Sequence, residues 1–393
     1  MYRLLGAPPV ARRIDDGARE ARGNQGEERD GMERTDETKY WVAFHQAPYI
    51  GPMRLARLRQ RFGNLERAWR ADARELAAVL DGRSVESLLR TRRSLDPDRE
   101  LERIEQSGIT AMSIDDARYP RRLREIPAPP SVLYVRGELT PADDTAVAIV
   151  GTRRATASGR EIAGRLGEEL AAAGVTVVSG LARGIDGAAH QAAVRAEGRT
   201  IAVLGSGPDV IYPPEHRSLA ERIVEQGAVL SDYPPGRKPD AMNFPARNRI
   251  ISGLSLGVIL VEAPAKSGAL ITADFAADQG RDVFVAPGNM LAPASAGSNA
   301  LLRDGARAIT SASDVLEDLR LGVAGQPAAV QQLLPLEGDA GRLLALLSLD
   351  PMHIDDLAAA AGLEIAHAGA LLMMLQLDGR VRDAGANHYI RSR

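Results

Sequence analysis

Short runs of apolar residues alternate with amphipathic stretches through the middle of the chain, from about residue 146 to 309. Near-continuous Val, Ile and Leu runs are typical of strands covered on both faces, and the stretches between them are long enough for crossover helices. We therefore expect an α/β fold with a Rossmann-like, doubly wound, mostly parallel sheet, whose ligand crevice lies beyond the carboxyl ends of the strands. The predicted strands are 147–150, 175–178, 201–204, 228–230, 258–261 and 283–286.

A helical region is predicted before this segment. Residues 39–125 show the spacing of several short amphipathic helices, broken at Gly51 and Gly63, which is typical of a domain of the SAM or helix-hairpin-helix type. Its arginines fit either DNA contacts or an ordinary solvated helix face, and the second interpretation is preferred. A Pro-rich joint then precedes a strand at 132–135, and the Rossmann-like domain is predicted to span 126–320.

A second small domain is predicted at the other end. After a linker at 321–338, residues 339–393 have the pattern of three helices and a hairpin, which is the order of a winged-helix domain. Its third helix, predicted at 364–377, carries no Lys or Arg. We therefore do not expect this helix to read a DNA groove.

Composition limits the classes of protein that fit. Residues 14–38 are highly charged and poor in apolar side chains, so residues 1–38 are predicted to be a disordered tail, with Met32 as an alternative translation start. The 393-residue chain has a net charge of -3 and no cysteine, which excludes disulfides and thiolate metal sites and favours a local basic patch over a wholly basic surface. Because it contains no apolar run of about 20 residues, we expect a cytoplasmic protein without membrane contact.

The turn after the first parallel strand can bind an anion. Gly151 ends the strand and is followed by Thr152, Arg153 and Arg154, and a helix is predicted to begin with Ser158 as its N-cap. Backbone N–H groups at a helix N-terminus and guanidinium groups both favour negative charge. The later glycines of G-x-G-x-x-G are missing and no Walker A motif occurs, so no nucleotide cofactor is predicted. The alternative is a purely structural turn.

Glycine and polar residues follow the other predicted strands as well. Because these loops converge on one rim of the sheet, their glycines allow an extended ligand to approach the backbone, and their cations supply positive charge. The candidate residues in these loops are Gly151, Thr152, Arg153, Ser179, Gly180, Arg183, Lys238, Lys266, Ser267 and Gly268.

A further polar cluster, Arg247, Asn248 and Arg249, follows the aromatic residue Phe244. The Phe244 ring could stack a base, and the polar side chains could bind phosphates or base edges. The alternative is that Phe244 belongs to the core and that one of the arginines pairs with Asp232 or Glu262.

Catalytic and metal sites have little support in the sequence. Asp186 and His190 lie one helical turn apart, but no nucleophile elbow or cysteine accompanies them. We interpret Asp186 as a residue of a helix N-terminus and His190 as a hydrogen-bonded core histidine. The other histidines are scattered and no H-E-x-x-H motif occurs, so no metal site is predicted.

Taken together, the strand-end motifs resemble those of the DprA/Smf family of DNA-processing proteins. The matching segments are 151–153, 179–186, 212–213, 244–254 and 267–272. The resemblance implies a Rossmann-like domain that binds single-stranded DNA without a cofactor, forms a homodimer and helps load RecA recombinase during natural transformation. It also implies that the chain is not an enzyme.

The same resemblance implies roles for individual residues. It assigns phosphates to the loops at Gly151, Ser179 and Ser267 and their neighbouring glycines, charged contacts to Arg153 and 247–249, and a base to Phe244. Some members carry a lysine three residues before this phenylalanine, where the present chain has Ala241. Lys238 or Arg237 could substitute for it from another position in the loop.

Two other classes of function remain open. One is a Rossmann-like nucleotide hydrolase of the phosphoribohydrolase type, in which Glu262 would act in acid-base chemistry, although the Pro-Gly-Gly-x-Gly-Thr motif of those proteins is missing. The other is a structural adaptor that uses only its terminal domains.

Overall fold

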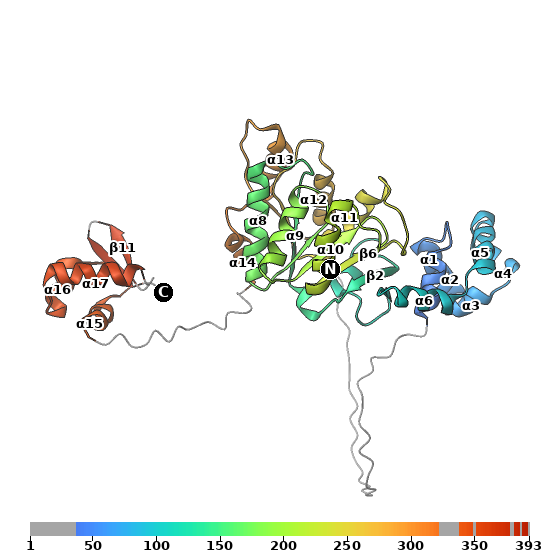
Figure 1. Ribbon diagram of the computed structural model, residues 1–393, viewed down its shortest axis with the longest axis horizontal. Helices are drawn as coiled ribbons and strands as arrows, with labels where there is room; N and C mark the ends of the chain where they lie inside the picture. Colours follow the sequence, from blue (N-terminus) through green and yellow to red (C-terminus); the bar gives the residue numbers. More distant parts are fainter. Residues whose placement is uncertain (1–36, 322–337, 349–350, 378–380, 386, 392–393) are drawn as a thin grey trace, which may run out of the picture.

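The computed structural model describes residues 37–321, 338–348, 351–377, 381–385 and 387–391 (Figure 1). The predicted tail at 1–38 and the predicted linker at 321–338 lie outside these residues except at their ends. The described parts are an N-terminal group of helices, a central sheet with its helices, and a small C-terminal unit.

A nine-stranded sheet occupies the centre of the chain, in the order β1-β2-β6-β5-β4-β3-β7-β8-β9. Neighbouring strands from β6 to β9 run parallel, whereas β2 runs antiparallel to both β6 and β1. The mostly parallel Rossmann-like sheet predicted from the sequence is therefore confirmed. The strands are β1 (Thr110–Ser113), β2 (Val132–Gly137), β3 (Ala146–Val150), β4 (Thr176–Ser179), β5 (Thr200–Leu204), β6 (Ala228–Ser231), β7 (Gly257–Leu260), β8 (Asp282–Val285) and β9 (Arg307–Ala308).

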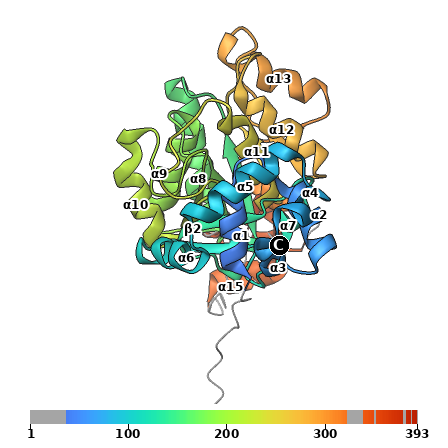
Figure 2. The same cartoon turned by 90° about the vertical axis from the view of Figure 1, so that its right-hand side faces the viewer.

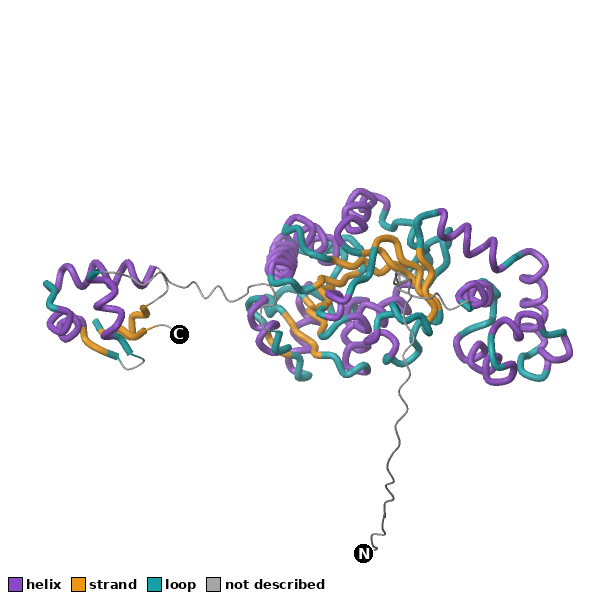
Figure 3. Tube along the Cα trace, turned by 90° about the horizontal axis from the view of Figure 1, so that it is seen from below, coloured by secondary structure: helices purple, strands orange, loops and turns teal. Residues whose placement is uncertain are grey.

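Helices cover both faces of the sheet, as Figure 3 shows. Alternate residues of one strand point to opposite faces: Val147 and Ile149 pack with α8, α9 and α14, whereas Ala148 and Val150 pack with α11 and α12. Helix α10 packs on the α9 side. The helices are α7 (Arg121–Arg124), α8 (Ala157–Ala172), α9 (Ile185–Arg195), α10 (Arg217–Gln226), α11 (Asn243–Leu254), α12 (Gly268–Asp278), α13 (Ala296–Arg303) and α14 (Ala312–Asp318).

The start of α8 differs from the prediction. Thr156 is the N-cap, and its hydroxyl accepts a hydrogen bond from the Gly159 N–H at 3.0 Å. Ser158, the predicted N-cap, lies inside the first turn, so that prediction was wrong. Both residues satisfy the N-cap preference, and the path of the preceding loop decides between them.

Six short helices form an N-terminal module with its own core, which includes Trp41, Phe44 and Trp69. The module packs on β1 and β2 through Ala111 and Tyr134, and Figure 2 shows α1 and α6 beside β2. Strand β1 lies within the range predicted as helical, yet it extends the central sheet. The helices are α1 (Thr38–His45), α2 (Pro52–Phe62), α3 (Leu65–Arg70), α4 (Ala73–Ala77), α5 (Gly82–Ser94) and α6 (Pro97–Gln106).

The C-terminal unit contains the predicted three helices and hairpin around a separate core that includes Leu343, Leu357 and Leu372. No single helix in the described ranges is long and apolar enough to cross a membrane, and Ile354–Ala361 with Ile365–Gln376 meets those criteria only as a pair bent by 106°. The elements are α15 (Asp339–Leu346), β10 (Met352–His353), α16 (Ile354–Ala361), α17 (Ile365–Leu377), β11 (Val381–Gly385) and β12 (His388–Arg391).

Asp186 and His190 have the structural positions expected of them. Asp186 lies in the first turn of α9 and accepts hydrogen bonds from the N–H groups of Gly180 (3.2 Å) and Ala182 (3.4 Å). His190 is fully buried, and its Nδ1 lies 2.7 Å from the Thr200 hydroxyl. Both interpretations are therefore confirmed.

Burial lowers the pKa of His190 from 6.5 to about 3, which predicts acid sensitivity. Below about pH 6.5 the unfolded chain binds a proton at His190, whereas the folded chain does not until about pH 3. The free energy of unfolding therefore decreases as the pH is lowered, and at pH 5 it is about 2 kcal/mol smaller than at neutral pH. We expect His190→Asn, whose amide can keep the contact with Thr200, to lose less stability between pH 7 and pH 5 in urea unfolding. An identical loss in both proteins would contradict this prediction.

Candidate nucleic-acid interface

The sheet changes winding direction at β3, which has β4 on one side and β7 on the other. Open α/β sheets bind ligands beyond the carboxyl ends of the strands at such a point. A cleft of about 720 Å³ lies there, between the loops that follow β3 and β7. A smaller cavity of about 280 Å³ shares Arg153, Phe244 and Arg247 with the cleft, so the two form one continuous depression.

The loop after β3 is held against β7 and α9. A Cβ atom at Gly151 would lie 2.5 Å from Ile185 Cγ1 and 2.9 Å from the Glu262 carbonyl oxygen, so only glycine fits there. The N–H of Thr152 donates to that carbonyl at 2.7 Å. The backbone beside Arg153 is therefore fixed in place before any ligand binds.

The N-terminus of α8 is already occupied by a carboxylate. Glu262 is 5% exposed, and its Oε2 accepts a hydrogen bond from the Thr156 N–H at 2.8 Å. In dinucleotide-binding Rossmann folds the pyrophosphate lies at this position. Because a negative charge of the protein fills it here, a cofactor phosphate would meet repulsion. The same contact gives Glu262 a structural role instead of the acid-base role considered for a hydrolase.

The N-terminus of α12, by contrast, is open to the cleft. The Ser267 hydroxyl accepts a hydrogen bond from the Ala269 N–H at 3.2 Å, and a Cβ at Gly268 would meet no atom within 4 Å. Lys266 is exposed beside it. An 11-residue helix with an open N-terminus and a neighbouring lysine favours an anion such as a phosphate.

An aromatic pair also lines the cleft. The Phe244 and Tyr212 rings have centroids 5.8 Å apart, and the Arg153 guanidinium lies 4.9 Å from the centroid of Phe244. Tyr212 is 39% exposed and Phe244 is half-buried. These rings can stack an unpaired base, with Arg153 placed for the adjoining phosphate.

The structure gathers most of the residues predicted from the sequence. Gly180 and Arg183 line the smaller cavity, where Arg183 is paired with Glu215. Ser179 and Lys238 line neither cavity, and Ser179 instead donates to the Ile149 carbonyl oxygen at 2.5 Å. The predicted residues that line the cleft are Gly151, Thr152, Arg153, Phe244, Arg247, Asn248, Lys266, Ser267 and Gly268.

Two arginines of α11 differ from their expected role as phosphate contacts. Arg247 is 4% exposed and donates to the Val203 carbonyl oxygen, and burial lowers its pKa to about 10. Arg249 pairs with Asp232 at 2.9 Å and does not line the cleft, so the alternative that one arginine pairs with Asp232 is confirmed. Arg247 forms part of the cleft floor as a buried cation.

Two cleft residues that can contact a nucleic acid, Tyr212 and Arg154, were missing from the predicted set. Tyr212 lines both cavities, and its signal in the sequence was the Tyr212-Pro213 pair that formed part of the family resemblance. Arg154, noted beside Arg153 but not selected, is exposed and lines both cavities as well. Ala241, which stands where some family members carry a lysine, lines the cleft, whereas Lys238 does not. Lys238 therefore does not replace that lysine in the cleft.

The charged side chains of the cleft indicate which kind of ligand it can bind. Among the described residues, Arg153, Arg154 and Lys266 line the cleft without a protein ion pair. In the same part of the chain, no three His, Asp or Glu side chains are grouped as metal ligands. The arrangement is suited to binding an extended polyanion with exposed bases.

Comparisons with known proteins identify the family of the chain. Residues 110–320 match the family model for DNA recombination-mediator protein A, and residues 327–387 match the DprA winged helix domain. Protein Smf of Synechocystis is 37% identical over 90% of this chain and 99% of its own length.

Two solved structures are similar as well. DprA of Streptococcus pneumoniae has 35% identity and a TM-score of 0.64 over 71% of this chain and 97% of that chain. DprA of Helicobacter pylori, whose structure concerns its binding of single-stranded DNA, has 32% identity and a TM-score of 0.49 over 54% of this chain and 95% of that chain. From the family models and the full-length relative, the chain belongs to the DprA/Smf family of DNA-processing proteins.

Proposed function

We propose that the chain binds single-stranded DNA along the cleft and passes the strand to a RecA recombinase during natural transformation. It acts in the cytoplasm as a homodimer and catalyses no reaction. This proposal rests on the contrast between two helix N-termini at one edge of the sheet. The Glu262 carboxylate occupies the N-terminus of α8, whereas the N-terminus of α12, beside Lys266, is open.

This contrast favours an extended ligand over a compact nucleotide. The place for a cofactor pyrophosphate is taken, whereas the unpaired cations and the open glycine follow the rim of the cleft. Phe244 and Tyr212 require a base that is free of its partner strand, because paired and stacked bases do not expose a ring face. These features support a single strand over a duplex.

Membership of the family supports the remaining parts of the proposal. The matching family model describes a recombination mediator, which fits the transfer of DNA to a recombinase. Sedimentation over a range of protein concentrations tests the homodimer, and RecA filament formation on DNA coated with single-strand-binding protein tests the transfer. A monomer at every concentration, or no stimulation of filament formation, would contradict the corresponding part.

Fluorescence anisotropy tests the central claim with a labelled single strand, its duplex, and ATP or NAD as competitors. We expect the single strand to bind more tightly than the duplex and its affinity to fall as the salt concentration rises. Arg153→Gln should reduce the magnitude of the slope of log K against log salt by about 0.7, because one phosphate contact is lost. The matched control is Arg165→Gln, because Arg165 is exposed on α8 and already paired with Glu169. Equal affinity for strand and duplex, or competition by the nucleotides, would contradict the proposal.

A further inference from the structure

A second cavity, of about 500 Å³, lies between the N-terminal module and the sheet. Its walls are the loop from α1 to α2, the Pro130-Ser131 joint, and the side chains of Asp232 and Arg249. It shares no lining residue with the cleft, yet α11 borders both: Arg247 and Asn248 face the cleft, and Arg249 faces the second cavity. The two spaces therefore lie on different sides of one helix.

The rim of this cavity repeats the aromatic and arginine pairing of the cleft. Tyr49 is 48% exposed, and the Arg83 guanidinium lies 4.0 Å from its ring centroid, as Arg153 lies over Phe244. The backbone φ of Tyr49 is +67°, a conformation that non-glycine residues rarely adopt. The fold thus holds a partly exposed ring in the lining of the cavity, where it can stack a base.

Asp232 lines the cavity, and one of its carboxylate oxygens has no hydrogen-bond donor among the described residues. Asp232 Oδ2 accepts from Arg249 at 2.9 Å, whereas the buried Oδ1 has no partner among the described residues. A buried carboxylate oxygen is costly to leave unpaired, and the amino or ring N–H groups of a nucleobase are suitable donors. Arg54 lies in the wall and adds positive charge near the opening, although it also pairs with Asp81.

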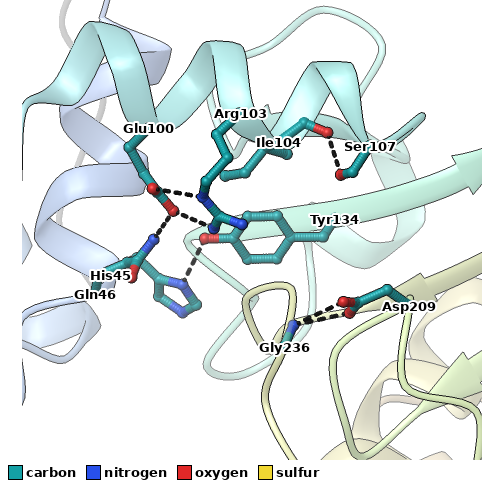
Figure 4. A network of polar contacts seen from close by, with 9 residues as sticks. All are labelled: His45, Gln46, Glu100, Arg103, Ile104, Ser107, Tyr134, Asp209 and Gly236. Atoms are coloured by element: carbon teal, nitrogen blue, oxygen red, sulfur yellow. Dashed lines mark hydrogen bonds and ion pairs between the residues drawn. The ribbon is translucent and has the colours of Figure 1, made fainter.

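The far wall is held in place by the polar network in Figure 4. His45, which lines the cavity, has its Nδ1 3.2 Å from the Tyr134 hydroxyl. Glu100 on α6 accepts hydrogen bonds from Gln46, next to His45, and from Arg103 at 2.6 and 2.9 Å. Because α1, α6 and β2 are tied together in this way, the cavity is formed before a ligand enters.

We propose that this cavity is a second nucleotide site for the DNA strand that occupies the cleft. Tyr49 stacks the base, and the Asp232 carboxylate turns its unpaired Oδ1 toward the cavity to accept a hydrogen bond from it. Between the two sites the strand crosses the N-terminal end of α11, where Pro245 and Ala246 are exposed. A volume of about 500 Å³ is ample for one nucleotide. The inference rests on the proposed function, because it extends the path of the same strand.

Photocrosslinking with 5-iodouracil tests the path directly. Single strands of about 5 and about 16 nucleotides are bound to the full-length chain, irradiated, and the crosslinked peptides identified by mass spectrometry. We expect both strands to crosslink to Tyr212 or Phe244 and only the longer one to Tyr49. Crosslinks of the longer strand confined to the cleft would overturn this inference alone. The absence of binding by either strand would overturn the proposed function.

Variants provide an independent readout of the same site. Tyr49→Ala is expected to weaken binding of the longer strand about tenfold and to leave the shorter strand unaffected, because stacking on this ring is lost. Arg83→Gln should act in the same direction. Its matched control is Arg90→Gln, which removes an equal charge from the same helix at an exposed residue paired with Glu86. Wild-type affinity of Tyr49→Ala for the longer strand would contradict the second site.

Discussion

Phe244→Ala weakens the binding of single-stranded DNA by about tenfold or more and leaves the fold intact. The half-buried ring contacts both the Tyr212 ring and the Arg153 guanidinium, so its removal takes away the stacking face and the support for both neighbours. Stacking of one base on an aromatic side chain contributes about 1 to 3 kcal/mol, and 1.4 kcal/mol is a factor of ten in affinity. Anisotropy titration with a labelled strand measures the effect.

The aromatic face itself can be separated from the volume of the side chain. Phe244→Tyr keeps the face and should retain most of the affinity, whereas Phe244→Leu keeps much of the volume and should behave like the alanine variant. Because stacking is largely insensitive to charge screening, the salt dependence should change little in all three variants. An unchanged dissociation constant for Phe244→Ala would show that the ring is only part of the core.

Arg247→Leu lowers the free energy of unfolding by about 3 kcal/mol or more, because it removes the positive charge that compensates the buried Asp186 carboxylate. The guanidinium donates to Val203, and its charge favours the ionised form of Asp186, although burial raises the pKa of this carboxyl overall. Without Arg247, the buried carboxylate loses its compensating charge. Urea unfolding at neutral pH measures the difference.

DNA binding by Arg247→Leu shows whether Arg247 is a buried residue beneath the cleft or a direct contact to a DNA phosphate. If Arg247 is buried as described, the slope of log K against log salt stays close to the wild-type value under conditions where the variant is folded. Adding Asp186→Asn to Arg247→Leu removes the uncompensated carboxylate and should restore part of the stability. Wild-type stability together with a slope smaller by about 0.7 would contradict the buried role.

Much of the fold could be predicted because its elements have local signatures. The strands from β3 to β8 consist largely of apolar residues, and glycine or polar loops follow them. Strand β1 was missed because Thr110–Ser113 is short and its mixed composition resembles the helical region before it. Strand β9 has only two residues, both exposed, and carries no hydrophobic pattern.

The candidate site was less predictable, because side-chain direction depends on packing. Arg247 and Arg249 occur in one short polar cluster, and residues two apart on a helix point to different sides. One therefore lies in the cleft floor and the other pairs with Asp232, which precedes α11 in the chain. Nothing in the local sequence indicates which arginine takes which role.

The order of the strands from β3 to β8 with their helices, the rim of glycine loops and the resemblance to the family could all be inferred from the sequence, because hydrophobic periodicity and turn chemistry depend on residues close together in the chain. Three features depend on the packed fold: Glu262 fills the N-terminus of α8, Tyr212 contacts Phe244, and a second cavity forms beside Tyr49. These contacts join segments far apart in the sequence, and their distances are set by how the strands are ordered in the sheet and how the helices and the N-terminal module pack against it.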